Sequence, residues 1–355
     1  MLDKIKIYVT AHTAGVLAKD AEAFEFYKRD GRTLNRNAFL TALFLNFRET
    51  YQAREDALFA FLKEEIGRET HMPEKKLDGL CYRIASHIHR EAAAPHREKF
   101  DSLLTLKPTR ESAAAIDYAE EYSLAGCSLS EYFRNLFSAY ASMPQDEREK
   151  IVFRPQYEAL QRAIDERRKV FLTTAGGAGK TEAAPYALAC SKEELHCYLL
   201  AVRGGACIPF RLSRIRSVTP LKEVSAFTPE QEAVFAKMLA YGPQFYYGKE
   251  ESPALVRLTA RGAEKFAKMY VHRPVPDRVE NNDYYFSCSL NQLFLYFCRF
   301  GKDAYAVYPE KLRRGLFAFH KQACSAHLAH SREKTMYAPP SGKAGTDAPD
   351  GPAGG

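Results

Sequence analysis

The sequence predicts a multidomain α+β protein with a helical region at the front, a small β-barrel in the middle and an α/β sandwich at the end. Three patterns predict this fold class. Alternating apolar residues at 3–10 and at 102–107 each precede two helical stretches. Five short strands are then crowded into about 60 residues after Ile164, and strands alternate with helices after Leu255.

The composition is that of an ordinary globular protein. The 355 residues suffice for two or three domains, and the apolar and charged shares of 46% and 27% exclude a disordered or fibrous chain. No signal segment is recognised, and the most apolar stretch, 290–300, is too short and too polar to span a bilayer. The eight cysteines lack paired spacings and are expected to be free thiols. A cytoplasmic protein without membrane contact is therefore expected.

Residues 1–66 form the first predicted unit. Its strand has an apolar side and an opposite, basic side, which consists of Lys4, Lys6 and Tyr8. A helix is expected from about residue 15 to 28. Asn35 then lies where it can cap a longer second helix with an apolar stripe.

The same order returns in residues 101–150 after a helical connector at 67–100. A short strand at 102–107 and a helix to about residue 122 lead to Ser128, a candidate cap of the last helix. One strand-helix-helix unit cannot bury its strand and both helix stripes alone. We therefore expect the second, degenerate unit to pair with the first through an antiparallel two-stranded ribbon.

The alternating basic strand and the run Asn35-Arg36-Asn37-x-Phe39-Leu40 resemble the ribbon-helix-helix family. In that family the ribbon enters the major groove of DNA, and the second helix grips a phosphate. The resemblance implies that Lys4, Lys6 and Tyr8 contact bases or phosphates, and that Asn35 and Arg36 contact the backbone. Residues 1–150 carry 22 Lys and Arg against 24 Asp and Glu, a net of −2, so a dimerisation or scaffold unit remains the alternative.

Residues 155–222 form the predicted barrel. Its expected strands are Lys169–Thr173, Glu182–Ala189, His196–Val202, Pro209–Leu212 and Ile215–Pro220. The glycine-rich run Thr173–Thr181 is expected to be a hairpin turn. A phosphate-binding loop would need glycine at Thr174 and a helix after Thr181, whereas Pro185 follows.

Three runs in this segment resemble the WYL domain, an Sm/SH3-like barrel of bacterial regulators: Pro185-Tyr186-Ala187-Leu188, Cys197-Tyr198-Leu199-Leu200-Ala201-Val202 and Phe210-Arg211-Leu212-Ser213-Arg214-Ile215. Cys197 replaces the tryptophan after which the family is named, and Ser213 replaces its usual acid.

The resemblance implies a groove for nucleic acid or a nucleotide-like ligand, lined by Tyr186, Tyr198, Arg211, Arg214 and Arg216. Guanidinium forks bind phosphate, and a tyrosine face stacks on a base. We expect the guanidiniums to open into a hollow beside Tyr198. From alternation alone, Arg211 and one of the other two arginines would be ordinary solvent-facing residues.

Residues 228–325 are similar to the extension that follows WYL domains. The similarity rests on Leu293-x-x-Tyr296, on Gly301 and on Pro309-x-x-Leu312-Arg313. It implies a ferredoxin-like α/β sandwich. Residues 338–355, rich in Pro, Gly, Ala and Asp, are predicted to be disordered.

These resemblances imply a nucleic-acid-binding transcriptional regulator that contacts DNA through its ribbon and senses a ligand in the WYL groove. Proteins with these parts also occur as accessory proteins of RNA-targeting CRISPR systems, so binding of single-stranded RNA is an alternative. The net charge of +9 after residue 150 is consistent with a single-stranded polyanion there. A protein-only oligomerising scaffold is the third possibility.

The sequence contains no constellation typical of an enzyme. No catalytic residue, cofactor or metal site is therefore expected. The expected partners are duplex DNA or single-stranded RNA or DNA, a nucleotide-like ligand and a second copy of the chain.

Overall fold

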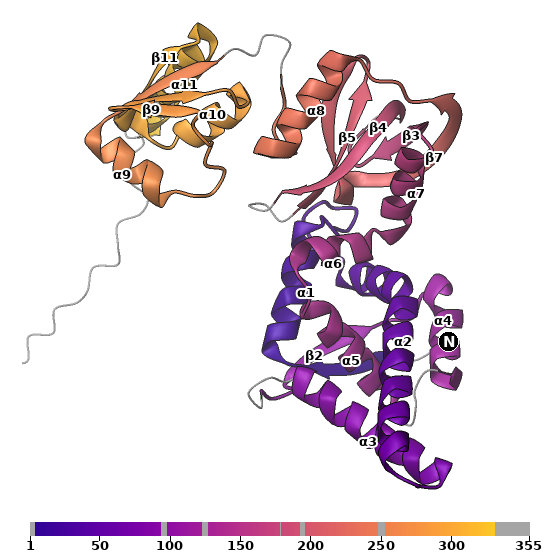
Figure 1. Ribbon diagram of the computed structural model, residues 1–355. Coiled ribbons are helices and arrows are strands. Elements are labelled where there is room, and N and C mark those ends of the chain that lie inside the picture. Colours follow the sequence, from indigo (N-terminus) through magenta and orange to yellow (C-terminus); the bar gives the residue numbers. More distant parts are fainter. Residues whose placement is uncertain are drawn as a thin grey trace, which may run out of the picture. The chain divides into compact units, whose positions relative to one another are not determined.

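The structure is a computed structural model that describes residues 4–93, 98–122, 127–177, 179–191, 196–247 and 253–330. The chain divides into two compact units, Met1–Tyr247 and Gly248–Gly355 (Figure 1). Helices and antiparallel sheets occur in both units, which confirms the α+β class. The tail predicted to be disordered, 338–355, lies outside the described residues. Among the residues described, no helix is long and apolar enough to cross a bilayer.

The first unit begins with a helical part. In chain order it contains β1 (Ile5–Val9), α1 (Ala11–Ala23), α2 (Arg36–Glu69), α3 (Glu74–Ala93), β2 (Ser102–Leu106), α4 (Arg110–Tyr122), α5 (Leu129–Ala141), α6 (Gln145–Val152) and α7 (Arg154–Asp165). The expected boundary between a first unit and a connector at residue 66 falls inside the last turn of α2, which continues to Glu69.

Helix α1 begins and ends earlier than the expected helix at 15–28. Thr10 caps it, because its hydroxyl accepts the backbone N–H of Thr13 at 3.2 Å. The helix ends before Glu25, whose φ of +60° lies in the left-handed region. The cap was not predicted, because Thr10 also fits the alternation of the preceding strand.

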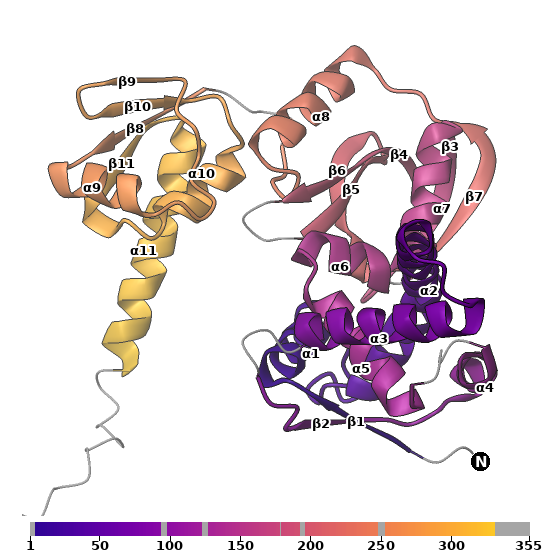
Figure 2. The ribbon, with the colours of Figure 1, turned by 60° about the horizontal axis from the view of Figure 1, so that its bottom comes forward.

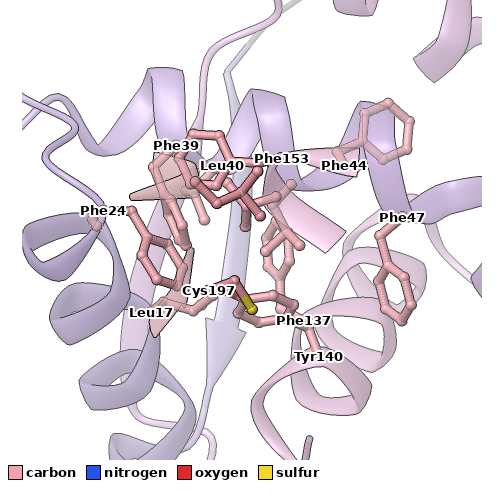
Figure 3. Close-up of a cluster of buried hydrophobic side chains, with 14 of the residues drawn as sticks. Leu17, Phe24, Phe39, Leu40, Phe44, Phe47, Phe137, Tyr140, Phe153 and Cys197 are labelled. Carbon is pink, nitrogen blue, oxygen red and sulfur yellow. The ribbon is translucent and has the colours of Figure 1, made fainter. Parts of the chain in front are cut away.

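The helical part and the following sheet share one hydrophobic core (Figure 3). Phe39, Phe44 and Phe47 of α2 are at most 1% exposed, as the predicted stripe requires. The same cluster contains Cys197 of the sheet. Because this core is continuous, the helical part and the sheet form one folded unit rather than separate domains.

A buried ion pair also ties the helices together. Asp20 of α1, whose side chain is 2% exposed, accepts hydrogen bonds from Arg148 at 2.6 and 3.0 Å. The Tyr140 hydroxyl donates to the same carboxylate at 2.7 Å. Burial is the main cause that raises the pKa of Tyr140 well above 10, so its hydroxyl remains a donor at neutral pH.

All five strands expected in the middle of the chain are present. They are β3 (Arg168–Thr174), β4 (Lys180–Ser191), β5 (His196–Arg203), β6 (Ala206–Arg211) and β7 (Ile215–Val224). Their order is β6-β5-β4-β3-β7, and all neighbours are antiparallel. The glycine-rich run is a hairpin turn, as expected, since Thr173 pairs with Lys180.

The sheet is strongly bent because the two halves of β4 pair with different strands (Figure 2). Its first residues pair with β3, and from Ala184 onward it pairs with β5. The register shifts between Pro185 and Ala187, where a bulge turns the strand. Proline suits this place because it has no N–H to donate to the ladder.

Helix α8 (Pro229–Tyr241) packs on this sheet. Phe235 stacks on Tyr186 of β4 with ring centroids 4.3 Å apart, and Phe227 meets Tyr186 edge-on at 5.2 Å. The expected start of the C-terminal extension at residue 228 is therefore too early. The division between the compact units falls after Tyr247, because the apolar face of α8 is buried against the sheet.

The second unit has a β-α-β-β-α-β order followed by a long helix. Its elements are β8 (Ala254–Leu258), α9 (Ala260–Lys268), β9 (Arg278–Glu280), β10 (Asp283–Phe286), α10 (Leu290–Phe297), β11 (Ala304–Tyr308) and α11 (Glu310–His330). The sheet order is β11-β8-β10-β9. Strand β9 was not predicted, because its three residues are all exposed and show no alternation.

Candidate nucleic-acid interface

The two N-terminal strands form the expected antiparallel ribbon. Ile5 of β1 pairs with Leu106 of β2, and the register continues to Val9 opposite Ser102. Ile7 and Val9 are fully buried beneath the ribbon. Alternation therefore leaves the predicted contact residues Lys4, Lys6 and Tyr8 exposed on the outer face, with Tyr8 43% accessible.

The two strands contribute different side chains to the outer face of the ribbon. Lys6 lies opposite Thr105, and Tyr8 lies opposite Leu103, which is 49% exposed. Lys107 follows β2 and is also exposed. The β1 half therefore presents cations and a phenol, whereas the β2 half presents a small hydroxyl and an apolar side chain.

Helices α2 and α5, which follow the two strands in the two halves, meet the ribbon in equivalent ways. Asn35 caps α2 by accepting the N–H of Ala38 at 3.1 Å, and Asn37 exchanges two hydrogen bonds with the backbone of Lys107 at 2.7 and 3.0 Å. A phosphate oxygen only accepts hydrogen bonds, and the side-chain oxygen of Asn35 already serves the cap. The predicted phosphate contact would therefore use the side-chain N–H groups of Asn35. Arg36 is exposed between them.

The second helix repeats this arrangement on the other strand. Ser128 caps α5 through the N–H of Glu131 at 3.2 Å, as predicted, and Ser130 donates to the backbone oxygen of Lys6. Asn37 and Ser130 each lie two residues after their cap and bind the strand of the other half. The two halves are thus related by an approximate two-fold arrangement within one chain.

The barrel arginines converge on an acid of the helical part. Arg214 donates two hydrogen bonds to Glu25 at 2.7 and 2.9 Å, and Arg211 lies 3.8 Å from the same oxygen. The hydrogen bond from Arg214 is the largest cause of a lowered pKa of Glu25, and the charges of Arg211 and Arg216 add to it. Glu25 is therefore ionised at neutral pH and neutralises much of the cluster.

The expected open hollow beside Tyr198 is not what the structure shows, and that prediction is wrong. Tyr198 is only 8% exposed, and it lies opposite Arg211 in the sheet. Arg211 also donates to the backbone oxygen of Ala23 and lies 2.8 Å from a ring nitrogen of His196. An internal carboxylate and a helix end occupy the place where a ligand anion was expected.

The five predicted groove residues do not form one site. Arg211, Arg214 and Arg216 gather around Glu25, and Arg216 and Arg214 remain exposed. Tyr186 instead belongs to the aromatic cluster under α8. Because its ring already stacks on Phe235, Tyr186 contributes to packing and is not available to stack on a ligand.

A second acid joins the helical part to the sheet. Glu149 of α6 is fully buried and accepts the backbone N–H groups of Cys197 and Ser213 at 2.6 and 3.2 Å. His196 lies 3.6 Å from it and also contacts Arg211. Glu149 therefore binds the backbone of Ser213, next to Arg214, which Glu25 binds through its side chain.

Neither Glu25 nor Glu149 was singled out from the sequence. Glu25 stands 189 residues before Arg214, and Glu149 stands 64 residues before Ser213. Each looks like an ordinary solvated acid in its own helix. In the sequence Glu149 lies between Arg148 and Lys150, so nothing local indicates that it is buried.

No family model matches the chain, and no curated protein matches its sequence. A solved structure described as the crystal structure of a CRISPR Cas-related protein is 18% identical, with a TM-score of 0.65 over 94% of this chain and 96% of that chain. The two proteins therefore share a fold over almost their whole lengths.

Proteasome accessory factor B/C of Arthrobacter aurescens is also similar over part of the chain. It is 17% identical, and the match covers 65% of this chain and 38% of that chain. The TM-score of 0.23 is too low for a structural argument.

Proposed function

We propose that this chain is a non-catalytic, nucleic-acid-binding regulator of the WYL kind that contacts its target through the β1–β2 ribbon. The observation that carries the proposal is the ribbon itself, completed within one chain and presenting Lys4, Lys6 and Tyr8 to solvent. Cations and a stacking ring on a two-stranded ribbon suit the major groove of duplex DNA.

The architecture behind the ribbon supports the same assignment. The bent five-stranded sheet, with β4 shared between β3 and β5, is consistent with an Sm/SH3-like barrel. The β-α-β-β-α-β order of the second unit and its strand order are consistent with a ferredoxin-like extension.

The arginine cluster takes a regulatory part in this proposal. A phosphate-bearing, nucleotide-like ligand has to displace Glu25 before it can pair with Arg211 and Arg214. Because Glu25 directly follows α1, which packs beside the ribbon, displacement would reach the DNA-binding part. Ligand binding and nucleic-acid binding would then be linked through a single carboxylate.

The second candidate is an accessory protein of a CRISPR system that binds single-stranded RNA. The nearly full-length fold shared with a CRISPR Cas-related protein favours this candidate. The outer face of β2 also favours it, because the exposed Leu103 cannot hydrogen-bond to a base edge in a duplex groove.

Binding measurements at several salt concentrations test the two candidates. The regulator predicts that Lys4→Ala/Lys6→Ala weakens duplex DNA binding strongly and lowers the salt slope by about 2. Lys222→Ala/Lys237→Ala is the matched control, because it removes two exposed lysines outside the ribbon. Its binding should be close to that of the parent protein.

The opposite pattern supports the accessory role. Single-stranded RNA would then bind more tightly than duplex DNA, and Arg211→Ala/Arg214→Ala would weaken it more than the ribbon variant does. If neither nucleic acid binds at low salt, both candidates are wrong and a protein-only scaffold is left. Sedimentation of the same samples tests the expected homodimer.

A further inference from the structure

The helical part of the first unit contains a cavity of about 210 Å³ between α2, α3 and α5. None of its lining residues belongs to the ribbon face or to the arginine cluster. The volume is below the ~300–1,000 Å³ typical of drug-sized sites, so only a small molecule fits.

Aromatic side chains form two walls of this cavity. Phe59 of α2 and Tyr82 of α3 pack with ring centroids 4.6 Å apart. Tyr51 and Tyr132 meet edge-on at 5.8 Å on α2 and α5. Aromatic faces attract a cation through their quadrupole as well as excluding water from it.

The charged groups of the cavity are predominantly acidic. Glu55, Asp56 and Glu131 line it, and His89, which lies 2.5 Å from Glu55, is the only basic side chain among the described lining residues. One imidazole cannot balance three carboxylates. The cavity is thus electronegative in a protein whose formal net charge is +7.

Two neutral groups beside the carboxylates have raised pKa values, mainly because they are buried and in part because of the acids. Burial raises the pKa of the Cys127 thiol to about 11, and the charge of Glu131 is the next cause. Burial likewise raises the pKa of Tyr51, with Glu55 adding to the shift. Both groups therefore stay neutral at physiological pH.

An amide oxygen in the cavity has no partner among the described residues. Gln52 donates through its nitrogen to Asp56 at 2.8 Å, but its Oε1 is buried and unpaired. A buried acceptor without a donor costs free energy. A ligand N–H would remove that cost.

We propose that this cavity binds a small organic ammonium ion that carries N–H donors, such as a linear diamine. Carboxylates and the Gln52 oxygen accept its N–H groups, while Phe59 and Tyr82 cover its alkyl part. A quaternary ammonium ion is disfavoured because it has nothing to donate. The proposal goes beyond the nucleic-acid function and does not depend on it.

Isothermal titration of the full chain with butane-1,4-diamine tests the proposal. We expect saturable binding that Glu131→Gln weakens at least tenfold and that Phe59→Ala weakens by roughly fivefold. Glu64→Gln is the matched control, because Glu64 lies on α2, pairs with Arg68 and does not line the cavity. It should bind the diamine like the parent protein.

Butane-1,4-diol and tetramethylammonium serve as ligand controls, since the first lacks charge and the second lacks N–H groups. Both should bind far more weakly than the diamine. No diamine binding at about 10 mM in low salt overturns the proposal, as does equal binding of the diol or full affinity in Glu131→Gln. If Glu131→Gln does not fold, judged by circular dichroism, Asp56→Asn replaces it with the same expected loss.

Discussion

Glu25, two residues after α1, and Arg214, directly before β7, are joined by two hydrogen bonds although 189 residues separate them in the sequence. The Arg214 side chain is 56% exposed and Glu25 is 27% exposed. Ion pairs that reach solvent add little to stability because water and salt screen them. The contact is therefore better suited to being exchanged for a ligand than to holding the fold together.

Glu25→Gln should leave the fold intact and open the arginine cluster to anions. We expect a change in the free energy of unfolding within about 1 kcal/mol and a roughly tenfold tighter binding of pyrophosphate, because the competing carboxylate is gone. Glu158→Gln, which breaks the exposed pair with Arg154, is the control. Unchanged pyrophosphate binding in Glu25→Gln would show that Glu25 does not compete with anions for Arg211 and Arg214.

The effect of Glu25 should depend on pH in one direction. Arg214 holds the pKa of Glu25 below its ordinary value, so the ion pair is intact at neutral pH and is lost as the pH falls through that lowered pKa. The difference between the parent protein and Glu25→Gln should therefore shrink on acidification. Pyrophosphate titrations and thermal unfolding between neutral and acidic pH measure it.

Arg148→Met should destabilise the first unit by about 3–5 kcal/mol, because it leaves the buried Asp20 carboxylate without its cation. Urea unfolding measures the change. The double variant Asp20→Asn/Arg148→Met should recover at least half of the loss. Arg68→Ala, which breaks only exposed pairs with Glu64 and Glu65, should cost less than about 1 kcal/mol.

Glu149→Gln should cost about 3 kcal/mol although it changes only one atom. An amide turns one of the two acceptors toward a backbone N–H as a donor, so Cys197 or Ser213 loses its bond. Faster amide exchange at those two residues should accompany the loss. Glu147→Gln on the same helix, with a 53% exposed side chain, should show neither effect.

Two glycines of the second unit should respond oppositely to alanine. A Cβ at Gly262 would lie 2.2 Å from the backbone oxygen of Asp303, which the N–H of Thr259 holds at 3.1 Å. Gly262→Ala should therefore cost about 1–3 kcal/mol or more. Gly315→Ala meets only Phe294, at 3.5 Å, and should stabilise α11 by up to about 1 kcal/mol. Hydrogen exchange over residues 253–330 of the full chain reads out both.

Much of the fold followed from short-range patterns. Strict alternation at Ile5, Ile7 and Val9 predicted the ribbon, because only one face of a strand can be buried. Side-chain capping predicted the beginnings of α2 and α5 at Asn35 and Ser128, since the cap is a local hydrogen bond. The five middle strands were also predicted from local signals, since glycine-rich or charged turns separate the short runs.

The candidate groove was not predictable in the same way. Alternation placed Arg211 and one of Arg214 and Arg216 near solvent, but it carried no information on what else reaches them. Glu25 does so only because α1 ends at Ala23 and Glu25 itself adopts a positive φ of 60°. The partner of a surface cation is a tertiary property, which no spacing within the strand can encode.

Both strands of the ribbon belong to one polypeptide, and this has a consequence for target choice. A ribbon formed by two identical chains is two-fold symmetric, so it favours a palindromic site, and it dissociates on dilution. Here Lys6 and Thr105 face each other without any association step. If the ribbon binds DNA as proposed, its target can be asymmetric, and formation of the ribbon does not depend on protein concentration.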